Sequence, residues 1–242
     1  MFIKRAIFKL QNLPNLISAQ YWLLRHSEFS RSSPNLPYQC QFPDPKRVAD
    51  YIEEDFSARD DNYKQSFGFK TDDEVDYWTH RGCGIACVKM LIEAKGEVSP
   101  TFASLTLDGK ALGGYDTATD RGWYYQPLVK LLAKYSIVSQ TRSYLPLVEL
   151  THKIATHNLA IVSVNPQIIR KDRKITSREK SGHLVLVTGV EISNRKINGF
   201  YINNPSGKTP DTQHNSFVPT SIFSQAYGSR GILVSNPQSK SS

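Results

Sequence analysis

The sequence predicts an α+β domain in which a layer of helices packs on an antiparallel sheet. Between residues 85 and 96, apolar side chains recur at three- and four-residue steps and stop at Gly96, which predicts a helix with one buried stripe. From Leu159 onward the apolar residues come in short, β-branched runs, which predict strands. The expected helices precede the expected strands, and the last strands are separated by hairpin-length turns. This order is typical of an α+β domain.

The other expected helices are less regular. The acidic run at residues 72–74 is suited to capping a short helix that leads toward Cys83, because carboxylates favour helix N-termini. Glycines in the stretch 109–122 predict a surface loop. Further helices are expected at residues 48–56, 128–135 and 146–157.

Four apolar runs predict strands, at residues 159–164, 184–190, 199–203 and 231–234. Between the first two lies the basic segment 170–180, which we interpret as a solvated loop. It ends next to His183 and could steer an acidic substrate.

The composition narrows the class of protein. The chain has 242 residues, of which 39% are hydrophobic and 21% charged, so it can bury a core as a globular domain. A net charge of +8 bears on solubility and association, but no nucleic-acid recognition motif accompanies it, and nucleic acid is not expected as a partner. The three cysteines are odd in number and too few for a disulfide framework, which favours a reducing compartment and a cytoplasmic location.

We expect three segments along the chain. Residues 1–35 form an N-terminal extension, helical or loosely ordered, with an amphipathic membrane anchor as a further alternative. Its apolar residues are too interrupted for a signal peptide or a transmembrane helix, and no transmembrane segment is expected. Residues 36–235 form the main domain, and residues 236–242 a disordered tail.

Cys83 is the candidate nucleophile. It stands at the start of the helix predicted after it, between Gly82 and Gly84, which have no side chains to cover the sulfur. The unpaired N–H groups and the positive dipole end of a helix favour thiolate over thiol. Cys87, one turn further along the same face, is expected in the core.

A cysteine nucleophile needs a base and a third group that orients the base. His183 follows Gly182 and opens a predicted strand, where its ring can reach a cleft. Asn204 comes at the end of the next strand, before a turn. If the two strands are hairpin neighbours, the end of one lies beside the start of the other, so His183 and Asn204 are expected to be adjacent.

Three blocks of sequence, at residues 83–92, 182–190 and 201–207, resemble the motif blocks of the C39-like cysteine peptidases, a branch of the papain-like fold. The resemblance covers about residues 36–234. It implies a papain-like cysteine peptidase fold, with the nucleophile helix in an N-terminal helical layer packed on a C-terminal antiparallel sheet. It also implies hydrolysis of a peptide bond through a thioester, with Cys83 as nucleophile, His183 as general base and then acid, and Asn204 as orienter. No cofactor and no metal are implied.

Two departures from that family stand out. Asn204 occupies a position where Asp is common, and an amide accepts the ring N–H without lending negative charge. The family's glutamine shortly before the cysteine, whose amide joins the oxyanion hole, is replaced here by Tyr77 and Trp78. Gln41 lies in a segment similar to the family's entry motif, although an insertion separates this segment from Cys83. The candidate oxyanion donors are therefore Gln41, the Trp78 indole and a backbone donor. The candidate substrate-binding residues are Gly182, His80 and Trp123.

Three functions remain open from the sequence. The first is a cysteine peptidase-like hydrolase, or a related amidase or acyl transferase, acting on a peptide or protein. The second is a catalytically weak or inactive papain-fold module that binds peptides without cleaving them. A structural metal site built from Cys40, His80, Cys83 and Cys87 is disfavoured because no Cys-x-x-Cys is present. The substrate sequence and the oligomeric state do not follow from the sequence.

Overall fold

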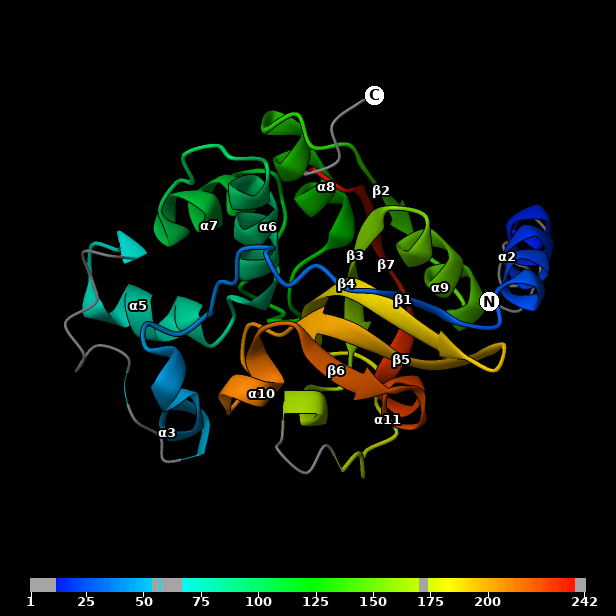
Figure 1. Ribbon diagram of the computed structural model, residues 1–242. Coiled ribbons are helices and arrows are strands. Elements are labelled where there is room, and N and C mark those ends of the chain that lie inside the picture. The colour runs from blue at the N-terminus through cyan, green and yellow to red at the C-terminus, as the bar shows by residue number, and fades with distance from the viewer. Residues whose placement is uncertain (1–11, 54–56, 58–66, 170–173, 238–242) are drawn as a thin grey trace.

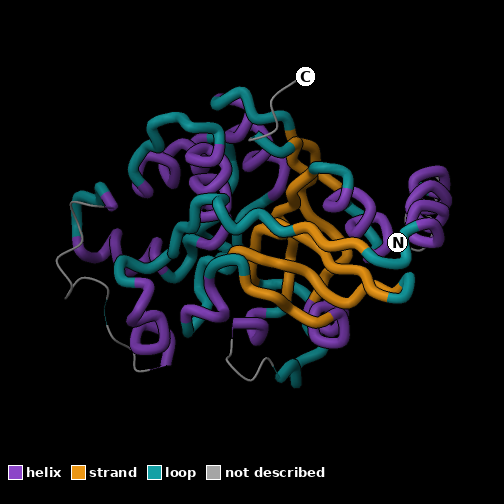
Figure 2. Tube along the Cα trace, viewed as in Figure 1, coloured by secondary structure: helices purple, strands orange, loops and turns teal. Residues whose placement is uncertain are grey.

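The computed structural model describes residues 12–53, 57, 67–169 and 174–237. The described residues form one antiparallel sheet of seven strands with helices on both of its faces (Figure 1, Figure 2). The strands run in the order β2-β7-β3-β4-β5-β6, and β1 pairs with β4 beside them. Their bounds are β1 Phe29–Arg31, β2 Ser139–Arg142, β3 Asn158–Val164, β4 His183–Ser193, β5 Lys196–Asn203, β6 Ser216–Pro219 and β7 Tyr227–Ser235.

Four helices that lie between β1 and β2 in sequence contribute to the core on one face of the sheet. They are α5 Asp72–Thr79, α6 Cys83–Ala94, α7 Phe102–Ala111 and α8 Tyr125–Lys134. The other face is covered by α9 Leu147–Ala155 and α11 Thr220–Ala226. The remaining helices are α2 Leu13–Arg25, α3 Val48–Glu53 and α10 Pro210–Gln213, with short 3-10 turns at Pro45–Arg47 and Pro166–Ile169.

Two apolar cores result from the alternation of side chains along the strands. In β4, Leu184 and Leu186 pack into the core beneath α6, whereas Val185 and Val187 join the core beneath α9 and α11. Because successive side chains of a strand point to opposite faces, a fully apolar strand requires cover on both. The predicted α+β fold is confirmed, with the addition that the helix over residues 147–155 covers the face opposite to α6.

Helix α6, which begins at Cys83, forms for the reasons that the sequence indicated. The apolar stripe of α6 is buried, and Gly96 follows its end with a positive φ of 81°, which suits glycine. Ahead of it, α5 begins with a capping box in which the Thr71 hydroxyl accepts from the Glu74 N–H and the Glu74 carboxylate accepts from the Thr71 N–H.

Several elements were absent from the prediction, namely α7, α10, α11, β1, β2 and β6. Helix α7 covers residues 102–111, so residues 109–111, expected in a loop, are helical instead. The Thr101 hydroxyl caps this helix by accepting from the Ser104 N–H, and its apolar residues are too few for a clear stripe. Strands β2 and β6 are short edge strands whose partly polar sequences lack an apolar run.

Part of the expected N-terminal extension is joined to the sheet. Helix α2 packs against α9, and β1 pairs with β4 through Phe29↔Ile192 and Arg31↔Val190. The chain passes so close to Gly189 that a Cβ there would lie 2.2 Å from the Arg31 carbonyl oxygen. The expected domain boundary at residue 36 stays a prediction. Residues 1–11, and 238–242 of the predicted tail, lie outside the described residues.

Among the helices of the described part of the chain, none has the length and apolar character needed to cross a membrane.

Candidate active site

Cys83 is the first residue of α6, and α6 packs directly on β4, which begins at His183. The two residues on either side of His183 both lie at Cys83. The Leu184 backbone N–H donates toward the Cys83 sulfur, and Gly182 lines the same cavity as Cys83. The structure therefore brings the predicted nucleophile and the predicted base to one place.

His183 and Asn204 are hydrogen-bonded. The β4–β5 hairpin pairs Leu186 with Asn203, which places the end of β5 beside the start of β4. The His183 Nε2 atom lies 2.8 Å from the Asn204 Oδ1 atom, and both side chains are buried. Among the hydrogen bonds of the described residues, those of the His183 ring use Nε2 only. When Nε2 carries the ring proton and donates it to Asn204, Nδ1 is the nitrogen that can accept a proton.

Ser206 is a third contact of this pair that the sequence reasoning missed. Its hydroxyl lies 3.2 Å from the His183 Nε2 atom, and its backbone N–H donates to the Asn204 Oδ1 atom at 3.3 Å. An asparagine that accepts from the N–H two residues on is a common turn arrangement, and the Asn-Pro-Ser-Gly sequence was the signal for it. Ser206 thus fixes the Asn204 amide oxygen, which in turn orients the His183 ring.

Gln41 lies between the Asn204 loop and the end of α5. Its backbone N–H donates to the Pro205 carbonyl at 2.9 Å, and its side-chain Nε2 donates to the Thr79 carbonyl at 2.8 Å. The segment around it is fixed to the same loop, because the Tyr38 hydroxyl donates to the Asn204 carbonyl at 3.0 Å. The structure therefore brings Gln41 to the neighbourhood of the α6 start, although a long segment separates it from Cys83 in sequence.

Trp78, the other side chain predicted as an oxyanion donor, lies in the apolar core. Its ring packs in the core against Tyr115, with ring centroids 5.3 Å apart, and against Trp123, at 6.2 Å. Neither Trp78 nor Gln41 is among the residues that line the cavity at Cys83.

The protonation of the pair is governed by burial. Burial raises the pKa of the Cys83 thiol to about 11, although the backbone N–H groups of Leu184 and Gly84 lower it in part. This is opposite to the acidic thiol expected from the helix start alone. Burial also lowers the pKa of His183 to about 4, although the hydrogen bond to Asn204 raises it. Each group on its own is therefore neutral near pH 7.

A cavity of about 760 Å³ opens at Cys83, within the range of ligand-binding clefts. All three predicted substrate-binding residues, His80, Trp123 and Gly182, line it. Its charged lining residues include Arg121, Glu179 and Arg230, with the last two contributed by the predicted steering loop and by β7.

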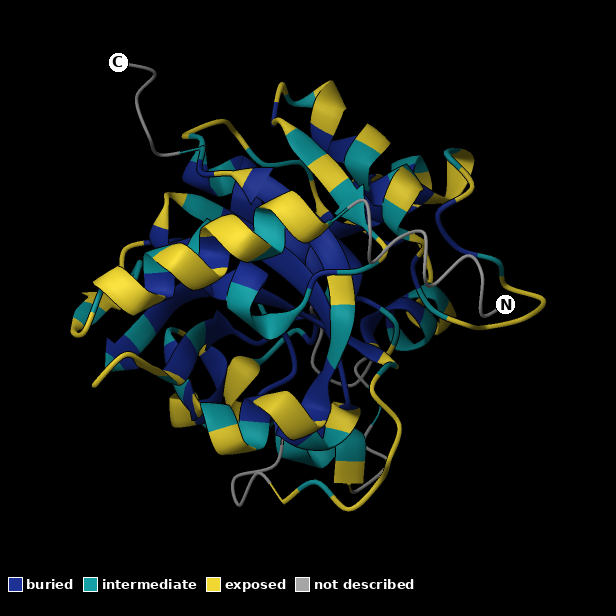
Figure 3. Ribbon diagram, turned by 90° about the vertical axis from the view of Figure 1, so that its right-hand side faces the viewer, coloured by how far each residue is buried: buried dark blue, intermediate teal, exposed yellow. Residues whose placement is uncertain are grey.

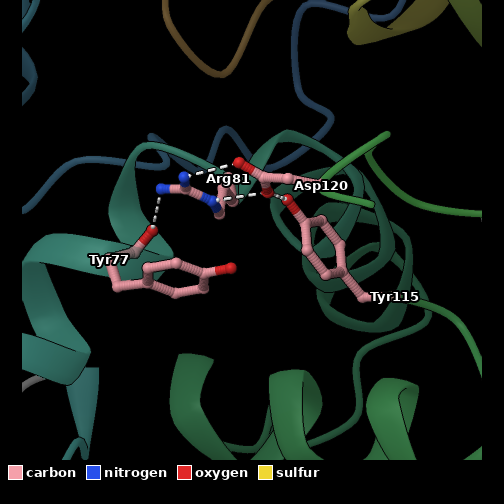
Figure 4. Close-up of polar contacts among 4 residues, drawn as sticks. All are labelled: Tyr77, Arg81, Tyr115 and Asp120. Atoms are coloured by element: carbon pink, nitrogen blue, oxygen red, sulfur yellow. Dashed lines mark hydrogen bonds and ion pairs between the residues drawn. The ribbon is translucent and has the colours of Figure 1, made fainter. Parts of the chain in front are cut away.

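One wall of the cavity is held by an ion pair that the sequence reasoning missed (Figure 4). Arg81, two residues before Cys83, donates two hydrogen bonds to the Asp120 carboxylate, at 2.8 and 2.7 Å. Its third nitrogen, Nη1, donates to the Tyr77 carbonyl at 3.1 Å, and the Tyr115 hydroxyl donates to Asp120. The Arg81 and Tyr115 contacts lower the pKa of Asp120 to about 2. The loop of residues 113–122 is thereby joined to the turn that precedes Cys83.

Trp123 continues this wall. Its indole N–H donates to the Arg81 carbonyl at 2.8 Å, and its ring lies against Gly84, where a Cβ would come within 2.9 Å of it. The glycine after Cys83 thus admits a tryptophan ring, whereas the sequence suggested only that it left the sulfur uncovered.

The described residues contain no group of three or more His, Cys, Asp or Glu side chains arranged to hold a metal ion. All three cysteines are free thiols.

The fold is a papain-like α+β domain. It has a sheet with helices on both faces, α6 packed on the central β4–β5 hairpin and a histidine–asparagine pair at the hairpin end. The chain belongs to the Peptidase_C39 like family, which matches residues 61–233.

Solved structures similar to this chain include the three that follow, and the first of them supports the fold. A crystal structure described as a C39-like peptidase from Bacillus anthracis superposes with a TM-score of 0.50 at 17% identity, covering 85% of this chain and 97% of that one. The peptidase domain of Streptococcus ComA, described as a bifunctional ABC transporter of a quorum-sensing pathway, gives 0.44 at 16% identity, over 64% and 91% of the two chains. A double glycine motif protease from an AMS/PCAT transporter, solved with its leader peptide, gives 0.41 at 15% identity, over 63% and 84%. No curated protein matches the chain.

Proposed function

We propose that this protein is a cysteine-type peptidase that cleaves peptide bonds with Cys83, His183 and Asn204. The observation that carries the proposal is the 2.8 Å contact between His183 and Asn204 at the point where the residues flanking His183 meet Cys83 and its cavity. A nucleophile, a base and an orienter of the base are the groups that acyl transfer through a thioester requires.

In the proposed reaction the Cys83 sulfur attacks the carbonyl carbon of a bound peptide while its proton passes to the His183 Nδ1 atom. Because burial keeps both groups neutral near pH 7, this proton moves during the attack instead of beforehand. Asn204 and Ser206 hold Nε2, so the ring keeps its orientation as it becomes charged. The imidazolium then protonates the leaving amine, and His183 activates the water that hydrolyses the thioester.

The negatively charged oxygen that forms during the attack needs hydrogen-bond donors to stabilise it. The backbone N–H of Cys83, at the open end of α6, is one candidate. The Gln41 amide is the other, because its Nε2 atom carries a second hydrogen beside the one donated to Thr79. Loss of one such donor costs about 3 kcal/mol in the barrier, so Gln41→Ala is expected to slow cleavage about 100-fold.

The test is digestion of a peptide library by the wild type and by Cys83→Ala, followed by mass spectrometry of the products. Cleavage by the wild type that disappears in the variant supports the proposal. Equal product from both proteins would end it. Peptides that are retained without cleavage would support the module that only binds.

Thiol alkylation near neutral pH supplies a readout that needs no substrate. Cys83 is expected to react faster than Cys40, whose pKa is raised to about 12 by burial, and faster than the buried Cys87. The rate at Cys83 should drop in His183→Ala, because the base is removed. Equal, slow labelling at all three thiols would contradict the assignment of a nucleophile.

A further inference from the structure

One face of α2 is apolar and exposed. Its large side chains are exposed by 48% at Leu13, 61% at Ile17, 55% at Tyr21 and 57% at Leu24. At 3.6 residues per turn these four positions fall within about 80° of the helix circumference. We call this row the α2 face. The opposite side of the helix, with Ala19 and Leu23, is buried on the side where α2 packs against α9.

The α2 face is unusual on this molecule. Eight large apolar residues of the described chain are exposed, and half of them lie on this one helix. The others are far apart in sequence: Leu107 lies on α7, and Val98, Tyr124 and Val138 lie in the segments between elements. Apolar side chains exposed singly are ordinary, whereas a continuous row marks an interaction surface. Figure 3 turns this end of the molecule toward the viewer and shows the outer side of the helix exposed.

Basic residues lie near the C-terminal end of the α2 face. Arg25 lies in the last turn of α2 with its guanidinium 4.4 Å from the centre of the Tyr21 ring. The β4–β5 turn, with the exposed Arg195 and Lys196, adjoins the end of α2, because the Arg195 N–H donates to the Ser27 carbonyl at 3.0 Å. Glu28, the acidic group at this place, accepts from the Asn194 N–H at 2.8 Å.

The sequence extends this bias. The first 27 residues contain Lys4, Arg5, Lys9 and Arg25 but no aspartate or glutamate. An apolar helix face with basic neighbours is the combination that binds anionic lipid surfaces, because the side chains enter the headgroup region while the cations meet lipid phosphates. A second copy of the chain would bring the same positive charges together, which disfavours self-association through this face.

We propose that the α2 face docks the protein on the surface of an anionic lipid membrane. The helix lies in the plane of the interface with Leu13, Ile17, Tyr21 and Leu24 directed into the lipid. Arg25, Arg195 and Lys196 meet the headgroups. Helix α2 stands at one end of the molecule and α5 at the other (Figure 1), so docking leaves the side that carries α5 in water. This proposal does not depend on the peptidase activity.

The test is co-sedimentation of the full-length protein with large vesicles, either phosphatidylcholine alone or phosphatidylcholine with 30% phosphatidylglycerol as the probe. We expect binding to the anionic vesicles and at least tenfold weaker binding to the neutral ones, with a loss of binding in high salt. In Ile17→Ser/Leu24→Ser the affinity for anionic vesicles should fall at least tenfold, because two large apolar side chains no longer enter the lipid.

The matched control is Val98→Ser/Val138→Ser, which removes two apolar side chains elsewhere that are even more exposed, by 97% and 72%, and should bind as the wild type does. Circular dichroism of each variant confirms that it is folded. Binding by the Ile17→Ser/Leu24→Ser variant equal to wild type, or no binding of the wild type to anionic vesicles, overturns the proposal. A dimer in sedimentation velocity that this variant abolishes would assign the face to a second copy and likewise overturn it.

Discussion

At His183, burial and hydrogen bonding act in opposite directions. The hydrogen bond to Asn204 favours the imidazolium, but the surroundings of the ring favour the neutral form more strongly, and the pKa falls to about 4. The Cys83 thiol is neutral for the same reason, with its pKa raised to about 11. A residue's position at a helix start therefore sets only part of its chemistry, because the cost of a buried charge depends on everything packed around it.

The buried histidine predicts a pH dependence of stability. An unfolded chain's histidine takes a proton near pH 6.5, whereas folded His183 does so only near pH 4. Between these values the unfolded state binds more protons than the folded state does. The contribution of His183 to the free energy of unfolding is therefore complete above pH 6.5 and falls as the pH drops toward 4. The loss attributable to His183 is at most about 3 kcal/mol. Urea unfolding at pH 7 and pH 4.5 measures it.

The control for that measurement is His183→Gln, which has no ring to titrate. The difference in unfolding free energy between pH 7 and pH 4.5 should be smaller in this variant than in the wild type. Equal differences in the two proteins would show that folded His183 takes up its proton as an unfolded histidine does.

Among the elements, the loop of residues 113–122 is joined to the turn before Cys83 by an ion pair. Arg81 joins the loop to the α5–α6 turn through two hydrogen bonds to Asp120. The two residues are far apart in sequence, and each is an ordinary surface charge when considered alone. The sequence alone therefore does not predict the ion pair between Arg81 and Asp120.

We expect Asp120→Asn to loosen this wall. Peptide cleavage should fall about fivefold in kcat/KM, chiefly through KM, while the free energy of unfolding changes by less than about 1 kcal/mol because the pair is partly exposed. Limited proteolysis within the loop should become faster, which is a readout that requires no substrate.

The matched control is Asp108→Asn, which removes an exposed ion pair to Lys134 on α7 and α8. It should leave both cleavage and loop proteolysis unchanged. If the two variants behave alike, Arg81 and Asp120 form no more than a surface ion pair.

The elements that the sequence predicted best are those with strong local periodicity. Helix α6 and strands β3, β4, β5 and β7 all appear where apolar runs indicated them. The weakly patterned α7, β2 and β6 were missed. Edge strands and short capped helices are stabilised by neighbours distant in sequence, so their own residues carry little signal.

For the whole molecule, the expected domain boundary at residue 36 predicts that residues 36–235 fold by themselves. Removal of residues 1–35 takes away α2 and β1, and with them the buried Leu23 and the pairing of Phe29 with Ile192. We expect the shortened protein to stay folded, because the two cores lie on the sheet, but to lose about 3 kcal/mol of unfolding free energy. Urea unfolding followed by circular dichroism measures this change.

Leu23→Ala in the full chain serves as the comparison and is expected to cost about 2 kcal/mol of unfolding free energy. A shortened protein that fails to fold while Leu23→Ala stays stable would place the domain boundary before residue 36.

The sequence by itself determined the class of fold, the helix that begins at Cys83 and the hairpin that brings His183 to Asn204. These features follow from local periodicity and from the spacing of two neighbouring strands, which are properties of short segments. The tertiary structure decided the rest: the contact of Ser206 with the His183 ring, the place of Gln41, the Arg81–Asp120 ion pair at the cavity wall and the neutral state of Cys83 and His183. Each of these depends on residues that only the folded chain brings together, and on the burial that their packing creates.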